Sequence, residues 1–172
     1  MNIAIVGATG NVGRKTLEVL EKKGLNIENL YLVASSKSAG KKIHFQGKDI
    51  LISELENFDF SKVKIAFFAA GGKISEKFAE KAAKHCFVID NSSYFRMDPD
   101  VPLIVPQVNS DDLNNIKKNI IANPNCSTAQ LVIALKPLHD LFTIKRIVVS
   151  TYQSVSGAGK ASMDELIKQT KL

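Results

Sequence analysis

The stretch that decides the fold is "NIAIVGATGNVG", Asn2 to Gly13, at the N-terminus. An apolar run leads directly into Gly7, Gly10 and Gly13, spaced G-x-x-G-x-x-G, and a helical pattern follows them. In such a turn the first glycine permits the sharp bend, the second lets the backbone approach a pyrophosphate, and the third lets helix and strand pack closely. The helix N-terminus favours phosphate through its free amides and its dipole. This stretch therefore predicts a Rossmann-like unit that binds a dinucleotide.

The sequence after this stretch alternates short apolar runs with helical patterns. The runs are apolar on both faces, as in parallel strands that are covered by helices. The pattern predicts an α/β fold with a doubly wound, mostly parallel sheet. The expected strands are residues 2–8, 30–35, 63–71, 86–93, 102–109 and 119–125, and the expected helices are 12–23, closed by Gly24, and 75–85.

The pattern changes near residue 126. A helix is expected over 127–141, a long strand over 144–157, and a helical segment over 160–172. One strand and two helices cannot form an independent core of ordinary size. We therefore expect a Rossmann-like NADP-binding domain over 1–126, and over 127–172 the beginning of a truncated α+β catalytic and dimerisation domain that continues beyond Leu172.

Composition narrows the class of protein. The chain has 172 residues, a net charge of +6 and two cysteines without a CxxC pair. No apolar run reaches the roughly 18 residues of a membrane span, and the N-terminus lacks the basic region of a signal peptide. The lysines are scattered without an aromatic-studded stripe, which argues against nucleic acid. We expect a cytoplasmic protein with no metal site, no membrane and a small-molecule ligand.

The second predicted strand indicates which dinucleotide binds. NAD-binding units usually end this strand with an acid that bonds the ribose hydroxyls. Here it runs "LYLVASSKSAGKK" and carries no acid. Its hydroxyl groups and cations suit an additional 2′-phosphate, so we predict NADP, held at Ser36, Lys37 and Ser38, with Lys41 and Lys42 adding positive field.

The segment "NPNCST", Asn123 to Thr128, holds one of the two cysteines. It ends a predicted strand and begins a helix, and ligands of open α/β sheets bind beyond the carboxyl ends of strands. A helix N-terminus favours the thiolate of Cys126, and the same amides can stabilise an oxyanion. A nucleophilic cysteine beside a nicotinamide suits aldehyde and acyl oxidoreduction. Cys86, which begins another strand, is expected to be a buried structural thiol.

Several motifs together resemble the bacterial aspartate-semialdehyde dehydrogenase family. They are collinear over the whole chain: "GATGNVG", "ASSKSAGKK", "AAGG", "VIDNSSYFRMDPDVPLIVPQVN", "IIANPNCST" and "VVSTYQSVSGAGK". The resemblance implies a homodimeric, NADP-dependent enzyme that interconverts L-aspartyl 4-phosphate with L-aspartate 4-semialdehyde and phosphate. That reaction serves lysine, threonine, methionine and diaminopimelate biosynthesis.

The resemblance also implies roles for individual residues. Cys126 is the thioester nucleophile, and Arg96, Asn125 and Gln153 bind the substrate, with Arg96 on its phosphate. The cofactor-binding residues it implies are Gly7, Thr9, Gly10, Asn11, Val12, Gly13, Ser36, Lys37, Ser38, Gly71, Ser156 and Gly157. Two positions depart from the family pattern, Gln107 for the usual glutamate and Ser154 for the usual alanine.

The family also uses a histidine general acid/base, and the three histidines here do not suit that role. His139 lies 13 residues after Cys126 on the same predicted helix, about 20 Å away. His85 precedes its predicted strand, at the wrong edge of the sheet. His44 follows the predicted 2′-phosphate loop, at the adenosine end. We expect the catalytic histidine beyond Leu172, so this chain alone should be inactive. Two alternatives stay open: a non-catalytic NADP-binding module, and a relative such as N-acetyl-glutamyl-phosphate reductase or a phosphorylating glyceraldehyde-phosphate dehydrogenase, against which "NPNCST" and "TYQSVSGAGK" argue.

Overall fold

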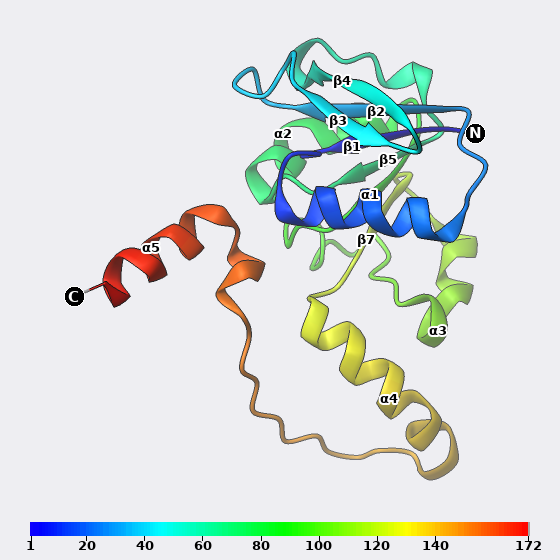
Figure 1. Ribbon diagram of the computed structural model, residues 1–172. Helices are drawn as coiled ribbons and strands as arrows, with labels where there is room; N and C mark the ends of the chain where they lie inside the picture. The colour runs from blue at the N-terminus through cyan, green and yellow to red at the C-terminus, as the bar shows by residue number, and fades with distance from the viewer. Residues whose placement is uncertain (172) are drawn as a thin grey trace.

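A seven-stranded sheet forms the centre of the molecule (Figure 1). The computed structural model describes residues 1–171. The strands lie in the order β3-β4-β2-β1-β5-β6-β7, and all neighbours are parallel except β3 and β4. The mostly parallel α/β sheet that the sequence predicts is confirmed. The strands are β1 (Asn2–Val6), β2 (Asn29–Ala34), β3 (Lys42–Phe45), β4 (Lys48–Glu54), β5 (Ile65–Phe68), β6 (Phe87–Asp90) and β7 (Ile120–Ala122).

Helices cover both faces of this sheet, as a doubly wound fold requires. Helix α1 (Asn11–Lys23) buries Leu17 and Leu20 in a cluster with Ile5 of β1. Helix α2 (Gly72–Ala83) packs in a second cluster, which contains the β1 residues on either side of Ile5, Ala4 and Val6. Because successive side chains of a strand point to opposite faces, the two clusters lie on opposite sides of β1.

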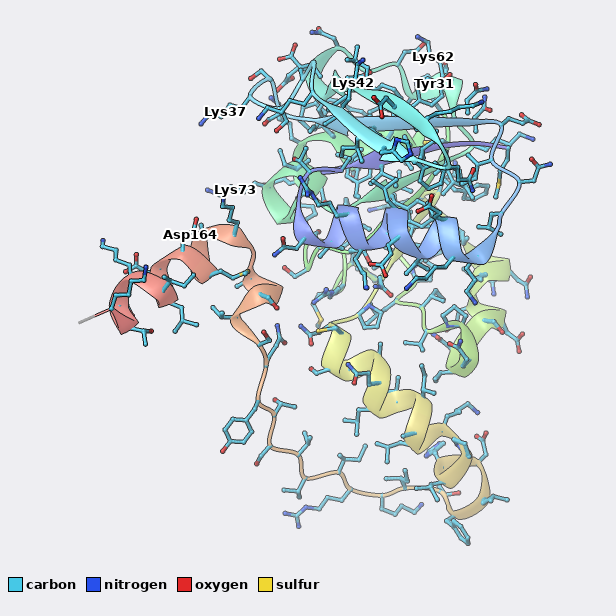
Figure 2. All side chains as sticks on the ribbon, in the orientation of Figure 1. Tyr31, Lys37, Lys42, Lys62, Lys73 and Asp164 are labelled. Atoms are coloured by element: carbon cyan, nitrogen blue, oxygen red, sulfur yellow. The ribbon has the colours of Figure 1, made fainter. Side chains whose placement is uncertain are left out.

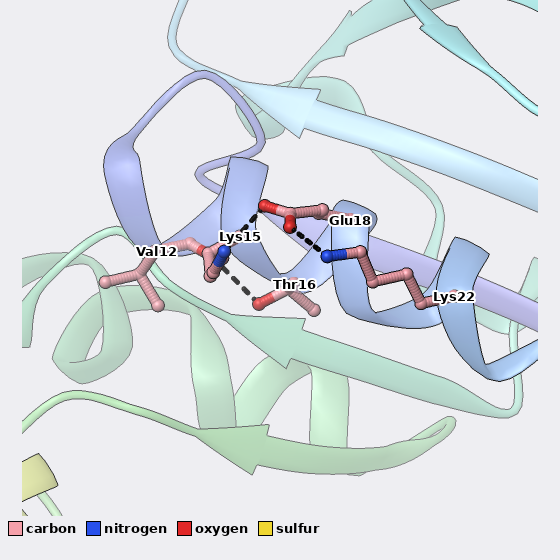
Figure 3. A network of polar contacts seen from close by, with 5 residues as sticks. All are labelled: Val12, Lys15, Thr16, Glu18 and Lys22. Carbon is pink, nitrogen blue, oxygen red and sulfur yellow. Dashed lines mark hydrogen bonds and ion pairs between the residues drawn. The ribbon is translucent and has the colours of Figure 1, made fainter.

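The outer face of α1 is a solvated network of ion pairs (Figure 3). Glu18 accepts hydrogen bonds from Lys15 Nζ at 2.7 Å and Lys22 Nζ at 2.8 Å. These two lysines lower the pKa of the Glu18 carboxyl to about 2. Gly24 ends the helix in the left-handed conformation at φ 59°, as the sequence predicts.

An edge hairpin, β3 and β4, was not predicted. Its strands are joined by Gln46 and Gly47, whose φ values of 47° and 77° suit a two-residue hairpin turn. The predicted strand over 102–109 is wrong: only an isolated bridge joins Leu103 to Ala122, and Pro106 begins the short helix α3 (Pro106–Asn109). Proline has no N–H to donate to a sheet, but it is well suited to the first turn of a helix.

The remaining segments lie beyond the sheet. Figure 1 shows α4 (Cys126–Phe142) leaving the sheet, and α5 (Lys160–Thr170) following after a long connection. Neither helix has a buried residue. The short 3-10 helices are η1 (Leu55–Asn57), η2 (Phe60–Lys62), η3 (Ser110–Asn115) and η4 (Val155–Ala158). None of the helices among residues 1–171 is long and apolar enough to cross a membrane.

The predicted strand over 144–157 is also wrong for this chain. Residues 144–154 carry no strand assignment, and η4 follows them. Val148 is 80% exposed and Tyr152 is fully exposed. A strand needs a partner to satisfy its backbone, and the described residues offer none here. The segment thus leaves apolar side chains exposed, a kind of surface that proteins usually bury.

Candidate functional site

The turn after β1 takes the geometry that its glycines predict. Gly7 has φ +86°, and its N–H donates to Val33 O at 2.8 Å, which ties the turn to β2. A Cβ on Gly7 would lie 2.8 Å from the backbone of Ala69, so a side chain does not fit there. A Cβ on Gly13 would lie 2.2 Å from Gly7 O, which confirms that Gly13 permits close packing of helix on turn.

The N-terminus of α1 is open toward solvent. Its N-cap residue is Gly10, which offers no side-chain hydrogen bond to the first amides of the helix. A Cβ on Gly10 would keep 3.4 Å from Gly7 O, so the fold itself does not require glycine at this position. Unpaired amides at a helix N-terminus, together with the helix dipole, favour an anion.

A cavity of about 870 Å³ lies against this turn. The volume is in the range of small-molecule and cofactor sites. Its walls include most of the residues that the sequence assigned to the cofactor and substrate. Those lining it are Gly7, Thr9, Gly10, Asn11, Val12, Ser36, Gly71, Arg96, Asn125, Ser156 and Gly157, whereas Gly13, Lys37, Ser38, Cys126 and Gln153 do not line it.

One end of the cavity lies at the carboxyl ends of β2 and β4. Ser35 and Ser36 line it from the loop after β2, and Glu54 and Glu56 line it from the end of β4 and from η1. Lys37 belongs to the same loop but reaches outward from it (Figure 2). The polar groups that line this end are therefore hydroxyls and carboxylates, and the lysine stands at its margin.

Arg96 lines the cavity on the side of β6 and β7. Its Nε donates to Asn123 O at 2.9 Å, and its Nη2 donates to Asn91 O at 3.2 Å. These carbonyls follow the ends of two neighbouring strands and hold the guanidinium in one orientation. The side chain of Asn123 also donates to Asn91 Oδ1 at 2.8 Å, which joins the two loops.

A buried carboxylate supports the loop that carries Arg96. Asp90 is fully buried at the end of β6 and accepts hydrogen bonds from Ser75 Oγ and Ser92 Oγ, both at 2.7 Å. It also accepts from the backbone N–H of Ser92 at 3.0 Å. Because a buried charge is costly unless it is hydrogen-bonded, these contacts fix the start of the loop against α2.

Cys126 is the first residue of α4 and is exposed to solvent. The preceding Asn125 caps the helix: its Oδ1 accepts from Ser127 N at 3.0 Å and from Ser127 Oγ at 2.7 Å. Cys126 Sγ lies 3.8 Å from the same oxygen. Since Asn125 lines the cavity, the thiol sits beside its rim. The predicted position of Cys126 at a helix N-terminus is confirmed.

Cys86 contrasts with Cys126. It is buried between α2 and β6, and its Sγ donates to Ala82 O at 3.4 Å. Burial raises the pKa of this thiol to about 11. The structural role predicted for Cys86 agrees with this environment.

A segment far along the chain supplies the opposite wall of the cavity. Ser156 and Gly157 of η4 line it, and a Cβ on Gly157 would lie 2.8 Å from Gln153 Nε2. Gln153 therefore packs behind this wall. Asn11 Nδ2 approaches Met163 Sδ at 3.5 Å, so α5 meets the N-terminus of α1.

Comparison with known proteins agrees with this geometry. The model of the family "Semialdehyde dehydrogenase, NAD binding domain" matches residues 2–116. The chain belongs to the semialdehyde dehydrogenase family. The model "Semialdehyde dehydrogenase, dimerisation domain" matches residues 135–172.

Relatives in this family resemble the chain throughout its length. The aspartate-semialdehyde dehydrogenase of Rickettsia bellii is 54% identical over 172 residues, which is 99% of this chain and 51% of the relative. Aspartate semialdehyde dehydrogenase II of Vibrio cholerae, solved in complex with ASA, has a TM-score of 0.93 and 52% identity over 98% of this chain and 51% of that one. The Candida albicans enzyme, solved with NADP, has a TM-score of 0.68 and 29% identity over 84% and 48%. The chain thus spans about half the length of these semialdehyde dehydrogenases, and it resembles their N-terminal portion.

The structure adds wall residues that the sequence did not assign. Glu54, Glu56 and Lys160 line the cavity of this semialdehyde dehydrogenase chain. Lys160 follows "SGAG", whereas Ser35, which also lines the cavity, is one of the loop hydroxyls that the sequence already assigned to the 2′-phosphate. The two glutamates had no sequence signal, because β4 itself was not predicted. The position of these glutamates at the cavity can be predicted only when the pairing of β4 with β2 is known.

The histidines lie away from Cys126. His139 is in the last turn of α4, whereas Cys126 is the first residue of that helix. His44 lies on the edge hairpin, where its Nδ1 is 3.0 Å from Asp49 Oδ1. Among residues 1–171, no group of three or more His, Cys, Asp or Glu side chains is placed to hold a metal ion.

Proposed function

We propose that this chain is the NADP-binding and nucleophile-bearing half of an aspartate-semialdehyde dehydrogenase. The complete enzyme reversibly reduces L-aspartyl 4-phosphate to L-aspartate 4-semialdehyde and phosphate. The observation that carries the proposal is the exposed thiol of Cys126 at a helix N-terminus, beside a cavity that the glycine turn and Arg96 share. The Vibrio cholerae relative solved with ASA and the Candida albicans relative solved with NADP support the substrate and the cofactor.

The residues of the cavity fit a dinucleotide phosphate. Gly7 and Gly10 bring the backbone to the pyrophosphate, and the uncapped amides of α1 face it. Ser36 lines the end of the cavity proposed for adenosine, where β2 ends without an acid. Lys37 and Ser38 lie outside the cavity lining in the same loop, and their charge and hydroxyl suit the 2′-phosphate. Gly71, Ser156 and Gly157 line the rest of the cavity and would hold the remaining length of the cofactor. When bound, the cofactor supplies hydride to the acyl carbon of the substrate.

The covalent chemistry belongs to Cys126. Its thiolate attacks the acyl carbon of aspartyl phosphate, the bond from that carbon to the phosphate oxygen breaks, and phosphate leaves as the thioester forms. Arg96, held by two carbonyls, presents its guanidinium to the phosphate, and Asn125 assists beside the thiol. Gln153 packs behind the cavity wall in this chain, and its proposed role of positioning the acyl group rests on the family resemblance. After reduction, Cys126 leaves as the thiolate and the aldehyde is released.

The partners and setting follow from the same proposal. The complete enzyme is a cytoplasmic homodimer in lysine, threonine, methionine and diaminopimelate biosynthesis. Residues 1–126 form its cofactor domain, and 127–172 begin the catalytic and dimerisation domain. The exposed apolar residues of α4 and of the segment after it support an unfilled interface, because such surface is usually buried.

The chain by itself is proposed to bind the cofactor without useful turnover. A general acid/base typically contributes roughly 10²–10⁴-fold. His139 is in the last turn of α4, His44 is on the edge hairpin and His85 precedes the amino end of β6, whereas Cys126 follows the carboxyl end of β7. The test is NADPH formation from aspartate semialdehyde and phosphate, with this chain and with the complete reading frame. We expect turnover by the complete protein alone. No activity in either would refute the enzyme assignment, and equal activity in both would refute the missing proton-transfer group.

A further inference from the structure

Glu54 is a carboxylate at the adenosine end of the cavity. It is the last residue of β4, it lines the cavity, and it is paired in register with Ala34, the last residue of β2. In the cavity that is proposed to bind NADP, β2 therefore ends without an acid, whereas the neighbouring strand β4 ends with the carboxylate of Glu54.

The order of the strand ends matches the order of groups in the dinucleotide. The glycine turn after β1 faces the pyrophosphate, and the end of the neighbouring parallel strand, β2, is where such folds read the adenosine ribose. The end of β4 lies one strand farther from β1, about 4.8 Å along the sheet. The group that follows the ribose in the cofactor is the adenine base. Glu54, at the end of β4, therefore lies where the adenine base of a bound dinucleotide is expected.

The hydrogen bonds of Glu54 leave one of its oxygens available. Its Oε2 accepts from Asn57 Nδ2 at 3.0 Å, which orients the carboxylate from η1. Within the described residues 1–171, Asn57 is the hydrogen-bond partner of the Glu54 side chain, and it bonds to Oε2 and not to Oε1. Glu56, the other acid of this wall, is bound instead to Lys77 Nζ of α2 at 2.7 Å. The two neighbouring acids therefore differ: one is paired with a cation and one still has acceptor capacity.

We propose that Glu54 selects the base of the cofactor by accepting a hydrogen bond from the exocyclic amino group of adenine. The proposal rests on the proposed function, which puts a dinucleotide in this cavity. A carboxylate only accepts hydrogen bonds, so it favours the C6 amino group of adenine and disfavours the C6 oxygen of hypoxanthine or guanine. Base recognition by Glu54 is then separate from 2′-phosphate recognition by Ser36 and Lys37, where an acid would repel the ligand.

The experiment measures a ratio of affinities. Dissociation constants for NADP and for nicotinamide hypoxanthine dinucleotide phosphate are determined by calorimetry on the 172-residue chain. We expect the parent to bind NADP about 10-fold or more tightly than the analogue, as for loss of a hydrogen bond to a charged group. In Glu54→Ala the ratio should fall to within about twofold of one. In Glu54→Gln the side-chain amide can donate to the C6 oxygen, so the ratio should fall or invert.

Two controls separate base recognition from other effects. Glu56→Gln removes the neighbouring acid, which is bound to Lys77, and should leave the ratio at the parent value. Lys37→Glu should lower NADP and analogue affinity together, because both carry the 2′-phosphate, and should leave their ratio unchanged. Circular dichroism and thermal unfolding establish that each variant is folded, and Glu54→Gln, which conserves shape, serves if Glu54→Ala is not.

The outcomes distinguish this inference from the proposed function. If the folded parent binds neither dinucleotide, the cofactor assignment itself fails. If the parent binds NADP and the ratio stays the same in Glu54→Ala and Glu54→Gln, the inference is overturned and the cofactor assignment stands. An equal loss of both ligands in Glu54→Ala, as for an acid that reads a ribose hydroxyl, would also overturn it.

Discussion

Brief alkylation of the folded chain should modify Cys126 and spare Cys86. The reactive species is the thiolate, and reaction also requires access. Cys126 is exposed at the first residue of α4, whereas Cys86 is only 6% exposed and donates its thiol hydrogen to Ala82 O. The two cysteines therefore differ in solvent access, and burial also disfavours ionisation of the Cys86 thiol.

The structure sets the size of the difference. Burial raises the pKa of Cys86 from 9.0 to about 11. At pH 8 its thiolate fraction is therefore on the order of 10⁻³, about 100-fold below that of a thiol with an unshifted pKa. Restricted access lowers the rate further. We expect Cys126 to react at least about 100-fold faster, and the slow reaction at Cys86 to accelerate about tenfold per pH unit between pH 8 and 10.

The assay uses short pulses of iodoacetamide, acid quenching and mass spectrometry of the peptides that contain each cysteine. Cys126→Ser should remove the fast phase and leave only slow modification of Cys86. In urea, both cysteines of the unfolded chain should react at similar rates, since the protection comes from the fold. Modification of Cys86 at a rate equal to or above that of Cys126 would refute the burial argument and the nucleophile assignment together.

Three further predictions concern the glycine turn, the choice of cofactor and the C-terminal segment. Gly13→Ala puts a Cβ 2.2 Å from Gly7 O and should destabilise the fold by about 1–3 kcal/mol or more in urea unfolding, whereas Gly10→Ala, with 3.4 Å of clearance, should leave stability nearly unchanged. Lys37→Glu should weaken NADP binding by about 1–3 kcal/mol and NAD binding less, and equal NAD and NADP affinities in the parent would contradict the choice of cofactor. Deletion of residues 143–172 should change stability by less than about 1 kcal/mol, because α5 has no buried residue, yet weaken NADP binding in calorimetry, because Ser156 and Gly157 leave the cavity.

The parts of the fold that the sequence predicted are those with strong local signals. Buried parallel strands require apolar residues on both faces, so the strands around Ile5, Leu32 and Val88 are conspicuous in the sequence. The edge hairpin is not, because one face of each strand is solvated and Lys42, His44 and Lys48 interrupt the apolar pattern. Its turn residues, Gln46 and Gly47, were the only local signal.

The failure over 144–157 has a different origin. Ile147, Val148 and Val149 have high β propensity, and the sequence pattern alone favours a strand. Propensity does not supply a neighbouring strand, and the backbone of an unpaired strand must bond to water instead. Local propensity therefore favours a strand over this segment, and the described residues supply no neighbouring strand to pair with it.

The candidate site likewise has parts that the local sequence predicts and parts that depend on strand pairing. The glycine turn and the nucleophile position are local features, and the structure places Gly7 and Cys126 as their motifs predict. The end of the cavity proposed for adenosine depends on how strands pair, and only the pairing of β2 with β4 brings Glu54 to the cavity. Lys37 was assigned by its position in the sequence, but side-chain direction is set by the loop, which turns it outward (Figure 2).

The cavity also explains why cofactor binding and turnover should separate in this chain. Its two walls come from the turn at Gly10 and from the segment at Gly157, nearly the whole chain apart, and Asn11 Nδ2 lies 3.5 Å from Met163 Sδ between them. Both walls lie within residues 1–171, so the ligand contacts that they provide do not depend on any further segment. The thiol of Cys126 instead sits at the rim, at the start of a helix whose side chains pack on nothing buried. Catalysis requires groups held on both sides of that thiol, whereas the proposed cofactor binding uses walls that lie within residues 1–171.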